Sequence, residues 1–197
     1  NHYEDSIKKR AAELLSELRG CLTLSMHSTQ SYRETFALVK TLDEETRDVC
    51  SRLSVSAVVD VGAYDKGRLF ESVPRTVEVE CGYQGSEQAI ENATALMWEY
   101  LGAVGALPAE RRTPQRDLPL YRLSNPVPKS GASTYEVYAS NFEEVEAGEA
   151  YAAAGDKEVV ADEGFYPVLM SPYGYENLFG YAAERVGSVS PGEMTSE

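Results

Sequence analysis

The sequence predicts an α/β fold, in which a mixed sheet with flanking helices is followed by a small all-β domain. From residue 3 to residue 101, segments with helical spacing of apolar residues alternate with short β-rich runs. Residues 102–119 are rich in glycine, proline and arginine and show no periodicity. Short strands separated by glycine-bearing turns follow. We therefore divide the chain into an α/β part (1–112), a β-domain (113–187) and a polar tail (188–197) expected to be disordered.

The first two elements are a helix and a strand. Residues 3–18 carry apolar side chains on one side of a helical wheel, and Arg19-Gly20 supplies a stop. From residue 22 to residue 26, apolar and hydroxyl residues alternate as in a strand, and the run ends on His27. Open α/β sheets bind ligands beyond the carboxyl ends of their strands, so His27 is a candidate functional residue.

Four further elements complete the α/β part. A capping-box pattern opens a helix over 41–53, and a short buried strand is expected at 56–61. A second β-rich stretch, 75–81, contains Glu80 and is followed by glycines that allow a sharp turn. Ser86 is placed to cap a helix with a broad apolar face that extends to residue 101. A carboxylate at the end of a central strand can act as a general base.

The second half of the chain shows only strand patterns. Runs of four to seven residues are separated by glycine and polar turns, which is typical of a small β-domain. The expected strands are 118–123, 134–140, 149–153, 158–161, 166–170 and 180–186.

Composition excludes several classes of function. The chain has 32 acidic against 18 basic residues, a net charge of −14, so nucleic-acid binding is not expected. No apolar run has the length of a membrane span, and no signal peptide is evident, so neither membrane binding nor export is expected. Three scattered cysteines are typical of reduced thiols in a cytoplasmic protein. Because the chain opens with Asn1 in a helical pattern, we expect it to be the carboxyl-terminal portion of a longer polypeptide.

Four segments together resemble the succinylglutamate desuccinylase and aspartoacylase family, a branch of the zinc carboxypeptidase fold. They are the strand ending on His27, the motif Glu80-Cys81-Gly82-Tyr83-Gln84, the segment 141–149 and the tyrosine-bearing segment 164–176. The similarity runs in order, with gaps, from about Tyr3 to Gly187. It implies a partial zinc-carboxypeptidase-like sheet, of which this chain would be the carboxyl-terminal part.

The resemblance implies a metal centre and a base. His27 matches the family's third zinc ligand, and Glu80 matches the general base that deprotonates a metal-bound water. Ser25 stands where the family usually has an aspartate. The family's upstream His-x-x-Glu pair is absent from this sequence. We therefore expect Zn²⁺ as the cofactor, one ion per site with further ligands upstream, and negligible zinc in this chain alone.

The resemblance also implies substrate contacts. Tyr64 and Arg68, four apart in a glycine-bearing loop, match a tyrosine and an arginine that contact substrate, with Arg75 as a rival for the second role. A guanidinium pairs bidentately with a carboxylate. Tyr175 matches a tyrosine that the β-domain directs towards the substrate.

These matches predict a zinc-dependent amidohydrolase that cleaves an N-acyl amino acid of the N-succinylglutamate or N-acetylaspartate type. One alternative is a lipoyl- or biotinyl-like carrier or binding module, suggested by Val145-x-x-Gly148 and by Lys157 after Gly155-Asp156. Another is a catalytically incomplete fragment. The sequence does not decide the oligomeric state, and a homo-oligomer stays open.

Overall fold

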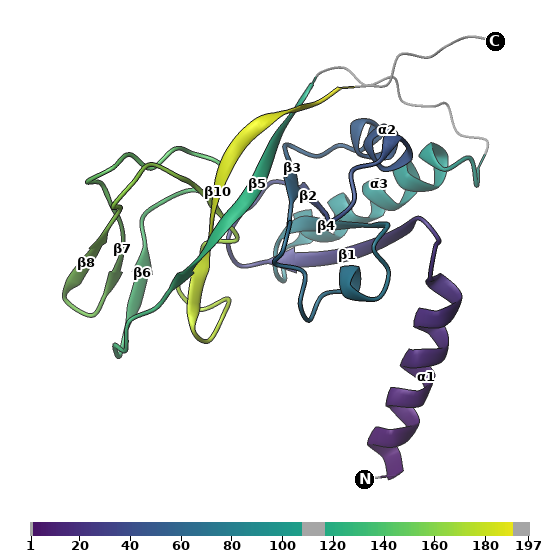
Figure 1. The fold of residues 1–197 in the computed structure, drawn as a ribbon, viewed down its shortest axis with the longest axis horizontal. Helices are drawn as coiled ribbons and strands as arrows, with labels where there is room; N and C mark the ends of the chain where they lie inside the picture. The colour runs from purple at the N-terminus through teal and green to yellow at the C-terminus, as the bar shows by residue number, and fades with distance from the viewer. Residues whose placement is uncertain (1, 108–116, 191–197) are drawn as a thin grey trace.

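A computed structural model describes residues 2–107 and 117–190 and contains one large and one small sheet (Figure 1). The helices are α1 (His2–Leu18), α2 (Glu44–Arg52) and α3 (Glu87–Ala103), with a 3-10 turn, η1 (Leu69–Glu71). The strands are β1 (Thr23–Thr29), β2 (Phe36–Val39), β3 (Val58–Asp60), β4 (Thr76–Tyr83), β5 (Leu118–Pro128), β6 (Tyr135–Val137), β7 (Ala150–Ala154), β8 (Lys157–Val160), β9 (Tyr166–Val168) and β10 (Leu178–Val189).

The large sheet is mixed and has seven strands in the order β1-β4-β2-β3-β5-β10-β9. The pairs β1/β4, β2/β3 and β3/β5 are parallel, whereas β4/β2, β5/β10 and β10/β9 are antiparallel. This agrees with the mixed α/β sheet expected from the sequence. The strand that carries His27 lies at the edge of the sheet, and the strand that carries Glu80 is its neighbour.

Strand alternation divides the core of the large sheet between its two faces. On β2, Ala37 and Val39 pack with residues of α2 and α3, whereas Phe36 and Leu38 belong to a second cluster on the opposite face. On β4, Val77 and Val79 face the helices, and the glutamates between and after them face the other way. The carboxylates of Glu78 and Glu80 therefore lie on the face without helices.

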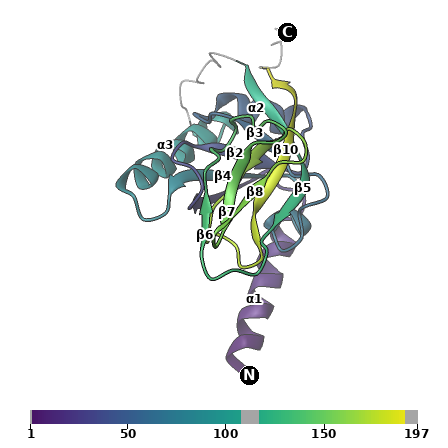
Figure 2. The same cartoon turned by 90° about the vertical axis from the view of Figure 1, so that its left-hand side faces the viewer.

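The separate small all-β domain expected from the sequence is not confirmed. Strand β5 pairs with β3 in the large sheet, and β10 and β9 extend the same sheet. Only β6, β7 and β8 form a second sheet, which lies beyond β5 and β10 in Figure 1 and faces the viewer in Figure 2. Lys157, the residue behind the carrier alternative, begins β8 in this small sheet. The expected boundary at residue 112 lies outside the described residues.

Several predicted boundaries differ from the structure. Strand β2 was not predicted, because its four apolar residues are all buried and show no alternation. Strand β1 continues to Thr29, so His27 lies within the strand and is not its last residue. The cap of α2 is Asp43, whose side chain accepts a hydrogen bond from Thr46 N, and not Thr41. The expected disordered tail begins too early, because β10 extends to Val189; residues 191–197 lie outside the described part.

The first helix, α1, projects away from the sheets (Figure 1). Its predicted helical character is confirmed, but its apolar residues Ile7 and Leu14 are exposed. Neither α1 nor any other helix within residues 2–107 and 117–190 combines the length and apolar character that crossing a membrane requires.

Candidate functional site

The site is built on two neighbouring parallel strands. In the register of β1 and β4, Ser25 lies opposite Glu78 and His27 lies opposite Glu80. Register partners leave the same face of a sheet, and residues two apart on one strand share that face. The hydroxyl, the imidazole and the two carboxylates therefore lie together on the face without helices.

Glycine and local hydrogen bonds fix the carboxyl ends of both strands. Gly82 has φ +115°, and a Cβ there would lie 2.8 Å from the backbone oxygen of Arg33. Only glycine allows this close approach without a shift of the backbone. Beyond it, Gln84 N donates to Thr29 O at 2.9 Å, which joins the end of β4 to the end of β1. The end of the Glu80 strand is thus held against the end of the His27 strand.

Glu80 is a buried carboxyl group with spare hydrogen-bonding capacity. It is 6% exposed, and its Oε2 atom has no hydrogen-bond partner among the described residues. Burial and the charge of Glu78 together raise the pKa of Glu80 to about 7, although Arg68 opposes the shift. A carboxyl group with a pKa near neutrality can accept and return a proton at physiological pH.

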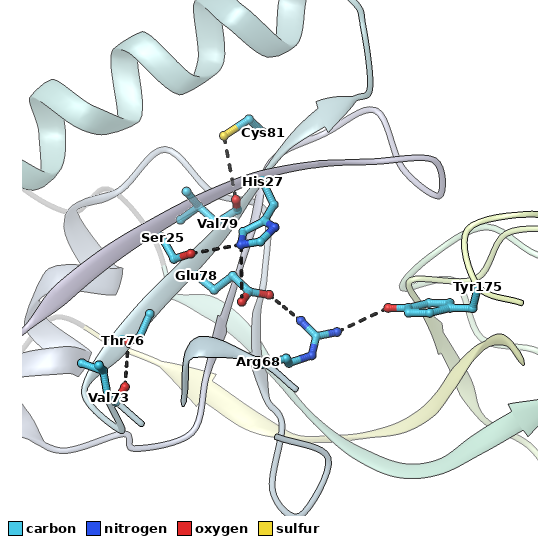
Figure 3. Close-up of polar contacts among 9 residues, drawn as sticks. All are labelled: Ser25, His27, Arg68, Val73, Thr76, Glu78, Val79, Cys81 and Tyr175. Atoms are coloured by element: carbon cyan, nitrogen blue, oxygen red, sulfur yellow. Dashed lines mark hydrogen bonds and ion pairs between the residues drawn. The ribbon is translucent and has the colours of Figure 1, made fainter. Parts of the chain in front are cut away.

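Glu78 contacts two side chains, those of Arg68 and His27 (Figure 3). Its side chain is 3% exposed, and its Oε1 atom accepts a hydrogen bond from Arg68 Nη1. Its Oε2 atom lies 3.7 Å from His27 Nε2, and that nitrogen also lies 3.0 Å from Ser25 Oγ. Burial opposes the charge on Arg68, but Glu78 and the nearby tyrosines raise its pKa above the ordinary value. Arg68 therefore stays charged and neutralises one of the two carboxylates.

A cavity of about 170 Å³ opens beside these groups. It brings together the carboxyl ends of β1 and β4 and the loop after β9. Its lining residues are Ser28, Thr29, Gln30, Glu80, Gln84, Leu169, Ser171, Gly174 and Tyr175. Of the residues predicted from the sequence, Glu80 and Tyr175 line the cavity. His27 and Arg68 are not among the lining residues, and both contact Glu78.

The loop after β9 is shaped by its own short contacts. A Cβ on Gly180 would lie 2.7 Å from Leu169 O, so the loop passes directly over the backbone of β10. Ser171 N donates to Phe179 O, and Gly174 N donates to Ser171 Oγ. These bonds direct Tyr175 towards Arg68, whose Nη2 donates to the phenol oxygen at 3.3 Å. Burial raises the pKa of Tyr175 to about 12, although Arg68 opposes the shift, so the phenol keeps its proton.

Tyr64 and Arg75 lie outside the cavity lining. The Tyr64 hydroxyl donates to Ser124 O at 2.6 Å, and its ring centroid lies 5.6 Å from that of Tyr181. Arg75 precedes β4 and pairs with Asp43 and Glu45 at the start of α2. Of the two rival arginines, Arg68 is therefore the one that contacts Glu78 and Tyr175.

Glu78 was not among the residues predicted from the sequence, and its contacts with Arg68 and His27 were not foreseen. The spacing of two residues between Glu78 and Glu80, which places both on one face of a strand, was visible in the sequence. The pairing of β1 with β4, which aligns Glu78 with Ser25, could not be read from it. The polar lining residues Thr29 and Ser171 carried no signal, because small hydroxyl residues occur in most loops.

The described residues do not make a zinc site by themselves. No group of three or more histidine, cysteine, aspartate or glutamate residues within residues 2–107 and 117–190 is arranged to hold a metal ion. The site has one imidazole, that of His27, and the carboxylate next to it, that of Glu78, is already paired with the guanidinium of Arg68. Structural and catalytic zinc sites have three or four protein ligands.

Comparison with solved structures identifies the fold. Murine aminoacylase 3 is 17% identical, with 92% of this chain and 71% of that chain covered and a TM-score of 0.67. A succinylglutamate desuccinylase/aspartoacylase from Rhodobacter sphaeroides is 14% identical, covering 84% and 58%, with a TM-score of 0.66. The product-bound ectoine utilization protein EutE (DoeB) from Ruegeria pomeroyi is 18% identical, covering 85% and 57%, with a TM-score of 0.60.

The mixed α/β sheet expected from the sequence resemblance is thus confirmed, whereas the separate small all-β domain is not. The neighbours are aminoacylase 3 and succinylglutamate desuccinylase/aspartoacylase proteins, and they cover most of this chain. No protein-family model matches the sequence, and no curated protein matches it significantly. At these identities the likeness establishes the fold alone.

Proposed function

We propose that this chain carries the general base and the carboxylate-binding groups of a site that hydrolyses the amide bond of an N-acyl amino acid, of the N-succinylglutamate or N-acetylaspartate type. The observation that carries the proposal is the position of Glu80. It is buried, its pKa is about 7, and it shares one cavity with Tyr175. The names of the structural neighbours, an aminoacylase and several desuccinylases, support this class of reaction.

In the proposed reaction, Glu80 first accepts a proton and then donates the same proton. Its carboxylate accepts a proton from the water whose oxygen attacks the amide carbonyl carbon. The carbon–nitrogen bond then breaks, and Glu80 returns the proton to the departing amine. The products are a carboxylic acid and a free amino acid. The Oε2 atom of Glu80, which has no hydrogen-bond partner in the described part of the chain, is the atom suited to this exchange.

Arg68 and Tyr175 supply the contacts for the substrate's own carboxylate. The guanidinium already binds Glu78 through Nη1 and the phenol through Nη2, so its orientation is fixed before a substrate binds. The Tyr175 hydroxyl keeps its proton and lines the cavity, and it can donate to an anionic oxygen. A preoriented donor pair lowers the entropy lost on binding. Tyr64 belongs to the packing around this pair.

Among the described residues, only His27 is proposed as a zinc ligand. Because the described residues do not make a zinc site, no step of the reaction above is assigned to a metal. In the proposed reaction, this chain's own residues transfer the proton, through Glu80, and orient the substrate, through Arg68 and Tyr175.

The test is release of amine from a panel of N-succinyl and N-acetyl amino acids, with the whole chain and added Zn²⁺. Glu80→Gln is expected to lower the rate by about 100-fold or more, the size of a general-base contribution. Glu158→Gln, an exposed glutamate on β8, is the matched control and should act as the unchanged protein does. Equal rates for Glu80→Gln and the unchanged chain would refute the assignment of Glu80. Binding of the amides without any release would favour the incomplete-fragment alternative.

A further inference from the structure

We infer that Glu78 is a positioning residue: its buried carboxylate holds the imidazole of His27 with the proton on Nε2 and leaves the lone pair of Nδ1 available. Only the use of the Nδ1 lone pair to bind a metal ion rests on the proposed function. The state of the ring is a property of the chain itself. The inference follows from three contacts to Nε2 and Glu78, and from the register of β1 and β4.

His27 Nε2 has two polar neighbours. Ser25 Oγ lies 3.0 Å away and Glu78 Oε2 lies 3.7 Å away. A serine hydroxyl can donate or accept, so the contact with Ser25 is compatible with either tautomer. An ionised carboxylate only accepts, and its negative charge favours a proton on the nearer ring nitrogen. Glu78, not Ser25, therefore decides which nitrogen carries the proton.

Burial and a contact with Arg68 keep the Glu78 carboxylate in place. Its side chain is 3% exposed, lies in the middle of β4, and binds Arg68 through the oxygen that does not face His27. One carboxylate thus spans two cations or potential cations, with one oxygen for each. A buried carboxylate with both oxygens used in this way has little freedom to rotate. Its direction is set before any ligand arrives.

The His27 ring is oriented by its polar contacts and not by packing. Its side chain is half exposed and stands on the edge strand of the large sheet. Packing alone would leave such a ring free to flip about its χ2 angle, which has a broad, roughly two-fold profile. Both contacts go to Nε2, and no hydrogen bond to Nδ1 is formed within the described residues. Ser25 and Glu78 together therefore fix the orientation of the ring, and Glu78 alone selects the tautomer.

The register explains how a carboxylate reaches this position. Ser25 and Glu78 are direct partners across β1 and β4, so the same place beside His27 can be reached from either strand. The side chain at position 25 is a neutral hydroxyl. The negative charge comes instead from the neighbouring strand. Glu78 thus performs for His27 what an acidic residue at position 25 would do, and it binds Arg68 as well.

The test is a long-range ¹H–¹⁵N correlation spectrum of the histidine side chains, recorded where the ring is neutral. The chain has two histidines, His2 and His27, so a His27→Gln spectrum assigns the signals. The expected pattern has a protonated-type Nε2 and an unprotonated-type Nδ1, with the two nitrogen shifts further apart than in the urea-unfolded chain. A proton on Nδ1, or the same separation in the folded and unfolded chains, would overturn the inference.

Two variants separate the carboxylate from the hydroxyl. Glu78→Gln is expected to move the two nitrogen shifts towards each other, because the amide can donate as well as accept. Ser25→Ala, which keeps the carboxylate, should keep the pattern of the unchanged chain. The opposite result, with Ser25→Ala mixing the tautomers and Glu78→Gln without effect, would transfer the role to Ser25. If Glu78→Gln does not fold, the folded and unfolded spectra of the unchanged chain still decide. A chain that releases no amine but shows the expected spectrum would uphold this inference while the proposed function fails.

Discussion

His27 and Glu80 are register partners across the parallel strands β1 and β4. Their side chains leave the same face of the sheet, but their surroundings differ sharply. The imidazole is half exposed at the sheet edge, whereas the carboxyl group of Glu80 is 6% exposed and lines the cavity. Glu78, two residues before Glu80 on β4, pairs with Arg68, whereas the Oε2 atom of Glu80 has no hydrogen-bond partner among the described residues.

Glu80→Gln should change how stability depends on pH. The folded pKa of about 7 is above the ordinary value of 4.5, so the folded state binds this proton more tightly than the unfolded state does. This contribution is fully present below pH 4.5 and is lost as the pH rises through 7. Its size is about 3 kcal/mol, from ~1.4 kcal/mol per unit of pKa. Urea unfolding at pH 5 and pH 8 should show the loss in the unchanged chain and in Glu158→Gln, but not in Glu80→Gln. An identical pH dependence in all three proteins would contradict the raised pKa.

Glu78→Gln should move the acid limb of the pH–rate profile. A general base works only when ionised, so kcat/KM of the unchanged chain should rise with pH through about 7. The charge of Glu78 raises the pKa of Glu80 and Arg68 lowers it, so removal of Glu78 should shift the limb to lower pH. The measurement is kcat/KM for one N-acyl amino acid between pH 5 and pH 9. A shift to higher pH would show that Glu78 does not act on Glu80 through its charge.

Arg68→Met should weaken substrate binding, and Arg75→Met should not. Hydrogen bonds to charged groups contribute ~1.5–3 kcal/mol, so loss of the guanidinium should raise KM by about 10-fold to 100-fold. Arg75 pairs with Asp43 and Glu45 away from the cavity, and its replacement should leave KM within about 2-fold. Because Arg68→Met leaves the buried Glu78 without its guanidinium, thermal melts of each variant must accompany the kinetics. Arg68→Lys provides a second variant that keeps the charge. The reverse order of effects would transfer the substrate role to Arg75.

Lys129→Met should misplace Tyr175. The Lys129 ammonium donates to Tyr175 O and lies 5.0 Å from the centroid of the Tyr135 ring. Lys129 N also donates to Asn177 O, so this residue fastens the Tyr175 loop to the end of β5. Loss of the ammonium should lower kcat/KM by up to about 100-fold, the cost of a displacement of about 1 Å in a catalytic group. Lys157→Met on β8 is the control. A Lys129→Met variant with unchanged kcat/KM would show that the backbone bonds alone fix the loop.

Metal analysis should find negligible zinc in the chain after dialysis. A single imidazole with a carboxylate already bound to Arg68 cannot replace the three or four ligands of a zinc site. The measurement is elemental analysis of the dialysed protein, with the His27→Gln variant beside it. One tightly bound ion per chain would show that residues outside the described part complete a site.

The candidate residues His27 and Glu80 and the strands that carry them were predictable, because period-two alternation marks both strands and both motifs are local. The helix at residues 87–103 was equally clear, since Ser86 caps it and its apolar residues recur at helical spacing. Strand β2 was not predictable, because a strand buried on both faces has no alternation and four residues are too few to distinguish it from other apolar segments.

The sequence by itself determined that a histidine and a glutamate each occur near the carboxyl end of a strand, and that helix and strand patterns alternate as in an α/β protein. Only the tertiary structure decided that β1 and β4 are adjacent, that β5, β9 and β10 complete one sheet rather than a separate domain, and that Glu78 joins His27 to Arg68. Periodicity along a strand depends on which face is buried and is therefore written in the local sequence. Strand order and register depend on contacts between residues distant in the chain, and no local pattern specifies them.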